Sequence, residues 1–363
     1  MNRFLGSFFG LIVFIGFSQE QTNNTFVDVN YFKGNIALHN KSVLHLIQGH
    51  PEGVIIGWNR ETDGSKLWEQ RFNYPDYGFS LSYHDLKSDI LGKTYGLYAH
   101  YNFYFLKRHL MFRVAQGLNF ATNPYDKFSN PKNNAFGSRV LSGTYLMLNY
   151  KSPKLMGPIG LQAGFTFTHA SNGSSKSPNT SINTMALNIG IHYDLETTDI
   201  DYKHVEDESQ FSRALQYNFI VRFGVNQSNI VGSPQYPFYT FSAYVNKQIT
   251  IKSALSLGVD AFFSKSLKAY IRYQSIAYPG PENDPNLDHK RVGVFAGYEL
   301  IINKLSVISQ LGYYVYYPYK FEGQVYNRIG MKYKLNKKWF TAITLKSHIA
   351  KAETLAIGIG IQL

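Results

Sequence analysis

The chain has 363 residues, a formal net charge of +12 and no cysteine. The lack of cysteine excludes a disulfide framework and a lipid-modified N-terminal cysteine, so stability has to come from packing and backbone hydrogen bonds. Beyond the N-terminus, no apolar run is long enough to cross a bilayer as a helix. Tyrosine and phenylalanine are abundant, at 28 and 27 residues, which favours an all-β protein with two different faces.

The N-terminus has the pattern of a secretory signal. A short basic region with Arg3 precedes an apolar stretch from Phe4 to Phe17, and the segment Gly16–Ser18 provides small residues before a cleavage site. We therefore expect residues 1–18 to be a signal peptide. For an exported protein, the positive net charge favours an anionic membrane surface over nucleic acid as the partner.

Two earlier alternating runs, 28–38 and 51–60, precede the main series of the chain. We interpret residues 19–76 as an N-terminal segment that forms further strands, a lid or a plug. Residues 63–75, which include Trp68, have the composition of an ordered loop.

From Tyr77 onward, apolar and polar residues alternate in runs of about the length of a tilted membrane strand, roughly 9–11 residues or slightly more. No helical periodicity persists there. The runs are 77–86, 94–107, 109–121, 138–151, 158–171, 181–195, 212–226, 236–249, 253–265, 289–302, 304–317, 324–335, 339–349 and 353–363.

The connections between these runs are alternately short and long, as in outer-membrane barrels, where the turns on one side are short and the loops on the other are long. The long acidic segment 196–211 is an exception, because it falls on the side of the short turns. We expect residues 77–363 to form a transmembrane antiparallel β-barrel of the bacterial outer membrane, with about 14 strands in a range of about 12 to 16.

The last run supports this fold class. Apolar residues alternate with small or polar ones from Leu355 to Leu363, which resembles the terminal strand of Gram-negative outer-membrane barrels, although those usually end in an aromatic residue. A water-soluble β-sandwich is the alternative, but it would need a protein partner for one face of many consecutive strands. A closed barrel in lipid satisfies every backbone group and every apolar face together.

Two polar residues interrupt the apolar face of the run that ends at Ser171. Phe165 and Phe167 lie on this face, and continued alternation places His169 and Ser171 in line with them. Counting back from the C-terminus places both at the outer end of their strand. Asn183, in the returning strand, is predicted to emerge beside them on the same lipid-exposed side.

This group of three predicts a serine hydrolase. A serine hydroxyl needs a neighbouring base to take its proton, and an imidazole serves best when a third group orients it. Ser171 is then the nucleophile, His169 the base and Asn183 the orienting group, and the backbone around Asn172 and Gly173 could donate to an oxyanion. The alternative is an interfacial belt, in which polar residues pair with lipid head groups, although belts more often use Tyr and Trp.

The segment His169–Gly173, followed by Pro178-Asn179 and Ile182-Asn183, resembles the active-site motif of the lipid A 3-O-deacylases of the PagL type, also described as acyloxyacyl hydrolases. The resemblance implies an outer-membrane barrel whose His169 and Ser171 face the lipid and remove an ester-linked acyl chain from lipopolysaccharide. It also places Asn172 near the oxyanion site.

The chain departs from that family in two ways. Asn183 stands where the family has an acidic residue, and an amide can orient the imidazole but cannot stabilise the imidazolium by charge. The chain is also much longer than the small eight-stranded barrels of the family.

The resulting hypothesis is an outer-membrane esterase that deacylates lipid A in the outer leaflet. It needs no cofactor, carries no recognised metal-ligand signature, binds no nucleic acid and acts as a monomer or homodimer. The alternative is a non-enzymatic porin or a transporter of hydrophobic molecules.

Basic residues near the predicted external rim are candidates for binding lipid A phosphates. The cluster Lys346, His348 and Lys351 surrounds the last hairpin, with Glu353 beside it, and Lys176 lies in the loop after the predicted active-site strand. Lys346 and His348 are expected in the lumen or at the rim. Solvated charge without a binding role is the alternative.

Overall fold

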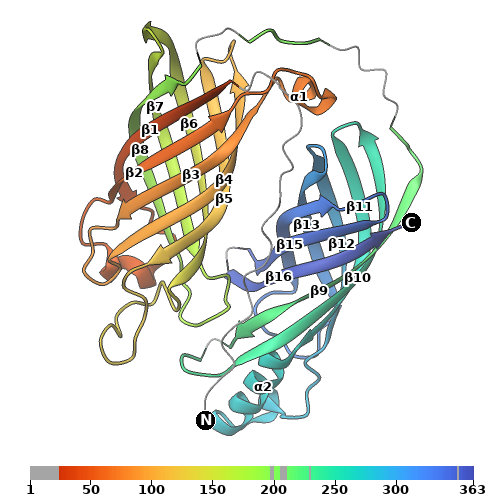
Figure 1. The fold of residues 1–363 in the computed structure, drawn as a ribbon. Coiled ribbons are helices and arrows are strands. Elements are labelled where there is room, and N and C mark those ends of the chain that lie inside the picture. Colours follow the sequence, from red (N-terminus) through yellow and green to blue (C-terminus); the bar gives the residue numbers. More distant parts are fainter. Residues whose placement is uncertain (1–23, 197–199, 205–210, 229, 350) are drawn as a thin grey trace, which may run out of the picture.

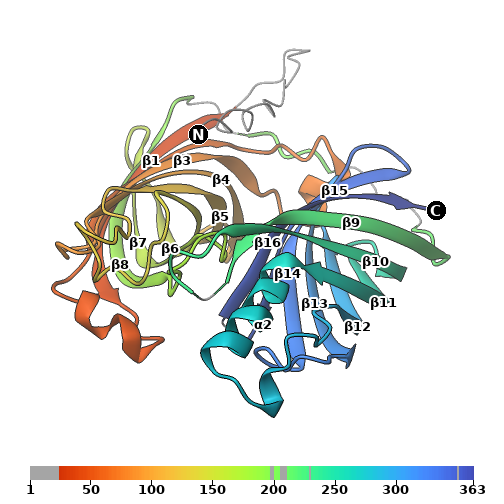
Figure 2. The ribbon, with the colours of Figure 1, turned by 90° about the horizontal axis from the view of Figure 1, so that it is seen from below.

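The computed structural model describes residues 24–196, 200–204, 211–228, 230–349 and 351–363. These residues form sixteen antiparallel strands in two closed barrels of eight (Figures 1 and 2). The first barrel contains β1 (Thr25–Ile36), β2 (Glu52–Arg60), β3 (Asp76–Asp85), β4 (Lys93–Phe105), β5 (Leu110–Ala121), β6 (Val140–Met156), β7 (Ile159–Ser171) and β8 (Ile182–Asp194). The second contains β9 (Leu215–Gln227), β10 (Gln235–Thr250), β11 (Ser253–Ser264), β12 (Arg291–Ile301), β13 (Leu305–Tyr316), β14 (Val325–Lys334), β15 (Trp339–His348) and β16 (Lys351–Gln362).

The all-β antiparallel fold is confirmed, and the strand number lies at the upper end of the expected range. The structure differs from the expectation of one barrel, because β1 pairs with β8 over eleven residue pairs and closes the first barrel before β9 begins. The acidic segment 196–211 falls in the connection between the barrels, which explains why a long segment lies on the side of the short turns. The predicted signal peptide, 1–18, lies outside the described residues.

Side chains fill the interior of the first barrel, as expected for eight strands. Arg113 and Asp28 form a completely buried ion pair, with Nη2 and Oδ2 2.6 Å apart, and Asn59 donates to the same carboxylate. Removing one partner of such a pair costs about 3–5 kcal/mol, because the other charge is left buried and unpaired. Phe32, Tyr98, Tyr145 and several smaller apolar residues pack beside this polar centre.

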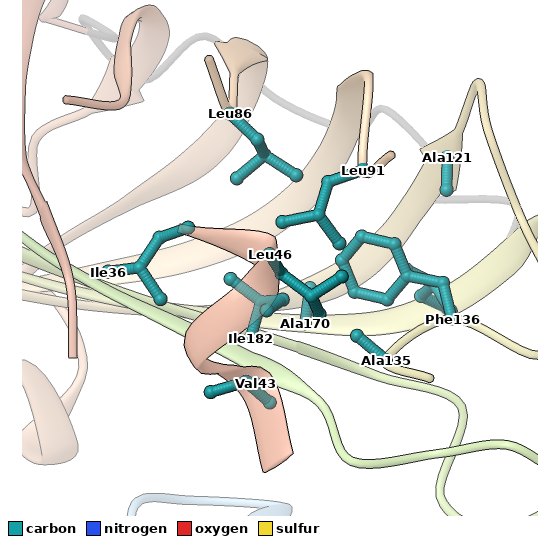
Figure 3. Packing of buried hydrophobic residues seen from close by; sticks show 11 residues of the cluster. Ile36, Val43, Leu46, Leu86, Leu91, Ala121, Ala135, Phe136, Ala170 and Ile182 are labelled. Atoms are coloured by element: carbon teal, nitrogen blue, oxygen red, sulfur yellow. The ribbon is translucent and has the colours of Figure 1, made fainter. Parts of the chain in front are cut away.

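An apolar cluster closes the mouth of the first barrel at the end where the long loops lie (Figure 3). Val43 and Leu46 come from the 3-10 helix η1 (Lys41–Leu46), which folds over the mouth between β1 and β2. They pack with Phe136 from the loop before β6, and with Ala170 and Ile182 from the ends of β7 and β8. The N-terminal segment thus provides two barrel strands and part of a plug.

The interior of the second barrel is strongly charged. Arg328 pairs with Asp260 at 3.0 Å, and Lys332 pairs with Glu299 at 3.1 Å. Arg222 is buried near Asp260 and donates to Ser242. Packed aromatic rings share this interior, so side chains fill this barrel as well.

The outward faces of both barrels are apolar and exposed. On β8, the outward residues Met185, Leu187, Ile189 and Ile191 are exposed, and Leu187 reaches 74%. Such a continuous apolar exterior is typical of barrels that span a membrane.

Four short helices or helical turns connect strands in the described part of the chain: η1, α1 (Leu67–Arg71), α2 (Lys265–Ala277) and η2 (Pro281–Asn283). None of the described helices has the length and apolar character needed to span a membrane. Helix α2 lies in a segment expected to be a loop; Ser264 caps it by accepting from the Leu267 amide. Its buried residues are Ser266, Leu267 and Ile271, too few to produce a clear helical pattern in the sequence.

Candidate active site

Strand β7 places His169 and Ser171 on the outer wall of the first barrel. Phe165, Phe167, His169 and Ser171 alternate with inward residues such as Thr166 and Ala170. Ala170, which lies between them in the sequence, points inward and packs in the apolar plug (Figure 3). The plug therefore packs against the inner side of this strand end.

Asn183 on β8 lies directly opposite His169 in the sheet register. The Nδ1 atom of His169 lies 2.6 Å from Oδ1 of Asn183. Because an amide oxygen only accepts, this hydrogen bond requires the proton on Nδ1. The Nε2 atom then keeps its lone pair, which is the tautomer that a general base needs.

Ser171 is held by the loop that follows it and is only 4% exposed. Its Oγ donates to Oδ1 of Asn179 at 3.1 Å and accepts from the Gly173 amide at 3.1 Å. Within the described part of the chain, no hydrogen bond joins Ser171 to His169. The two side chains share one strand face two residues apart.

The predicted oxyanion residues differ in their present partners. The Gly173 amide points at the serine oxygen, and Gly173 adopts a positive φ of 61°. The Asn172 amide is already engaged by Oδ1 of Asn179 at 2.9 Å, and its side chain donates to the Lys176 carbonyl. Asn179 therefore holds both the Ser171 hydroxyl and the Asn172 amide. The sequence predicted no such role for it, although it lies in the motif that resembles the family.

A row of polar side chains runs from the histidine across the neighbouring strands, on the outer surface of the barrel wall. Asn183, His169, Thr144 and Gln116 lie opposite one another on the adjacent strands β8, β7, β6 and β5. With strands about 4.8 Å apart, this row is about 14 Å long. Thr144 donates to Gln116 at 2.6 Å, and Gln116 donates to Ser142 at 3.0 Å.

The sequence did not lead us to predict the part of this row on β5 and β6. The signal was available, since Gln116, Ser142 and Thr144 are polar residues at outward positions of otherwise apolar strands. Only the register showed that they align with His169.

The predicted phosphate-binding residues lie in two different environments. Lys346 and His348 point into the second barrel, where they are buried and contact Glu353 at 2.6 and 2.8 Å. They are therefore not on a solvated rim. Glu353 reaches them because it is the extra residue of a bulge in β16, and a bulge redirects side chains.

The other two candidates are accessible. Lys351 is exposed and pairs with Glu322, and Lys176 is exposed beside Arg139 at an open hollow formed by the loops of the first barrel. No group of three or more potential metal ligands occurs among the described residues.

On the apolar outer wall of an eight-stranded barrel, a serine lies beside a histidine that an amide orients. This arrangement is a candidate site for ester hydrolysis at a lipid surface. The sequence matches the family of lipid A 3-O-deacylases (PagL) over residues 52–192 and the C-terminal domain of acyloxyacyl hydrolases (PagL_C) over residues 215–363. Each match falls on one barrel, and together they cover most of the chain. The chain belongs to the lipid A 3-O-deacylase (PagL) and acyloxyacyl hydrolase family.

No curated protein matches this sequence. Among solved structures, CdiB from Acinetobacter baumannii is 9% identical with a TM-score of 0.18, and the match covers 95% of this chain and 60% of CdiB. The siderophore receptor PirA from the same organism is 11% identical with a TM-score of 0.22, over 91% of this chain and 44% of the receptor. A mutant porin from Rh. blastica is 8% identical with a TM-score of 0.19, over 94% and 99% of the two chains. Similarities this weak add nothing to the fold described above.

Proposed function

We propose that this protein is a serine esterase of the bacterial outer membrane that removes an ester-linked acyl chain from the lipid A part of lipopolysaccharide. The observation that carries the proposal is the 2.6 Å contact between His169 and Asn183 beside Ser171, on an apolar outward face. A site on this face receives its substrate from the lipid, and the family membership supports lipid A as that substrate.

The reaction follows from the placement of the three side chains. The Ser171 hydroxyl breaks its hydrogen bond with Asn179 and gives its proton to Nε2 of His169. Its Oγ atom then attacks the ester carbonyl carbon. The resulting oxyanion accepts a hydrogen bond from the Gly173 amide, which now donates to the serine oxygen at 3.1 Å.

His169 then protonates the departing sugar oxygen, and the acyl chain remains on Ser171 as an ester. Water, deprotonated by the same imidazole, releases the fatty acid and restores the serine. Asn183 holds Nδ1 throughout, so Nε2 always faces the reaction.

The alternative of a porin or transporter has less support. Side chains fill both eight-stranded interiors, and the plug around η1 closes the mouth of the first barrel. Barrels of this size enclose packed side chains or at most one small ligand.

Lipid A phosphates need basic partners outside the barrel wall. Lys176 is the candidate that fits, because it is exposed and its loop carries the site. We propose no such role for Lys346 and His348, whose side chains contact Glu353 inside the second barrel. A monomer or homodimer remains the expected assembly.

Asn183→Glu is expected to raise the turnover number about 10- to 100-fold, because a carboxylate stabilises the imidazolium by about 1–3 kcal/mol more than an amide does. Asn183→Leu, which removes the hydrogen bond, should lower it. The measurement is kcat of the purified proteins on a short-chain p-nitrophenyl ester. If the glutamate variant were no faster than the leucine variant, Asn183 would not orient the base.

The polar row is expected to bind the uncharged polar groups of the substrate next to the scissile ester. Thr144→Val and Gln116→Leu each remove hydrogen bonds worth about 0.5–1.5 kcal/mol, so KM for lipid A should rise about 2- to 10-fold. The same variants should leave the short p-nitrophenyl ester unaffected, since it is too small to reach them. Thr341→Val, at an outward position of β15, is the matched control. Equal losses on both substrates would contradict a binding role.

A further inference from the structure

The backbone ladder that closes the second barrel stops part-way along the seam between β9 and β16. Backbone pairing between β9 and β16 runs from Asn218 and Gln362 to Phe223 and Ile357. Beyond that point the described strand ends, 224–227 and 351–356, are not paired with each other as a ladder. Backbone N–H and C=O groups that are left unpaired at such strand edges need other hydrogen-bond partners.

The Asn226 side chain of β9 supplies one partner by donating to the Glu353 carbonyl at 3.3 Å, and the loop after Ser171 supplies others. The Gln227 amide donates to the Ser174 carbonyl at 3.2 Å, and Ser174 Oγ donates to the Ala352 carbonyl at 2.6 Å. Ser174 therefore bridges the separated ends of β9 and β16. A residue three positions after the proposed nucleophile thus contacts both strands at the seam of the other barrel.

Neighbouring residues of the loop extend this contact. The Ser177 amide donates to Oε1 of Gln227 at 2.7 Å, and Ser177 Oγ donates to the Ser228 carbonyl at 2.8 Å. Gln235 donates to the Ser175 carbonyl at 2.7 Å. All three contacts join the loop of the first barrel to the edge of the second.

An apolar contact lies on the other side of the loop. A Cβ atom built on Gly173 would lie 2.9 Å from Cβ of Leu355 and 3.5 Å from Cδ1 of Leu345. Gly173, whose amide faces the serine oxygen, thus rests against the outer wall of the second barrel. The site lies where the two barrels meet.

We propose that the second barrel is a positioning domain that holds the catalytic loop, residues 172–179, in its working geometry. The inference rests on the proposed esterase function and assigns a role to the C-terminal half of the chain. The loop carries the Gly173 amide and Asn179, whose placement sets the oxyanion geometry, and a displacement of about 1 Å in such groups costs about 100-fold in rate. A glycine- and serine-rich loop loses much conformational entropy when it is ordered, and the contacts with the second barrel offset that loss.

Cysteine cross-linking tests the docking without reference to activity. The chain has no cysteine, so Ser174→Cys with Ala352→Cys creates the only possible disulfide. We expect oxidation of the folded full-length protein in membranes to protect both thiols from alkylation. Ser174→Cys with Ser253→Cys, at the opposite end of the second barrel, should remain fully alkylated. Equal alkylation of the two pairs would overturn the docking.

Gln227→Leu tests the effect of docking on catalysis. Gln227 lies in the second barrel and contacts Ser177 and Ser233, not the reacting atoms. We expect kcat to fall at least 10-fold on both lipid A and the short ester, with little change in KM. Gln248→Leu, the same substitution at the far end of β10, should keep full activity. Heat-dependent mobility on gels verifies that the barrels of both variants are folded.

The Ser174→Cys and Ala352→Cys pair in the Gln227→Leu background separates positioning from a general structural effect. Oxidation should restore kcat, and reduction should lower it again. An unchanged kcat in Gln227→Leu, or no restoration on oxidation, would overturn the positioning role. A wild-type protein inactive on both substrates would instead overturn the proposed function, while the cross-link would still report the docking.

Discussion

Ser171→Ala should abolish lipid A deacylation while both barrels remain folded. Removing the nucleophile of a serine hydrolase costs about 10⁴-fold or more in kcat, because no other group can form the acyl intermediate. The measurement is mass spectrometry of lipid A from Gram-negative cells that express the wild type, the variant or neither. We expect the loss of one hydroxyacyl mass with the wild type alone.

Ser253→Ala is a suitable control for this experiment. Ser253 is in β11, where its hydroxyl contacts the Tyr298 hydroxyl and no residue of the site. The control should process lipid A like the wild type. Unchanged lipid A in all cells, with the protein confirmed in the outer membrane, would point to another lipid substrate or to the channel alternative. Deacylation by Ser171→Ala would exclude Ser171 as the nucleophile.

His169→Gln should lower kcat about 10³- to 10⁴-fold, since the glutamine side chain keeps polar contact with Asn183 but cannot take the serine proton at neutral pH. The assay is hydrolysis of a short p-nitrophenyl ester by purified protein, which isolates the chemistry from lipid binding. His109→Gln is the matched control, because His109 lies in the turn between β4 and β5, at the opposite end of the first barrel. A variant at His169 that kept more than a tenth of the activity would require a different base.

Much of the fold could be predicted from the alternation of apolar and polar residues. The period of two residues per strand face determines which side chains point outward, and it placed His169 and Ser171 in line with Phe165 and Phe167. The pairing of His169 with Asn183 followed from the antiparallel direction of neighbouring strands. These inferences need only local geometry, which the sequence specifies well.

The division into two barrels could not be derived in the same way. Every strand carries the same alternating pattern, and nothing local in β1 specifies that its free edge pairs with β8 rather than with a later strand. Helix α2 was missed for a related reason, since it buries only a few residues and its contacts are with the mouth of a barrel that the sequence did not define.

The sequence by itself determined the all-β class, the outward direction of the His169 and Ser171 side chains and the family motif, because these depend on periodicity and on residues close together in the chain. Only the tertiary structure decided the role of Asn179, the alignment of Thr144 and Gln116 with His169, and the burial of Lys346 and His348 behind Glu353. It also brought Ser174 to the seam between β9 and β16. These contacts join segments far apart in the sequence, and their partners depend on how the strands close, which local patterns do not specify.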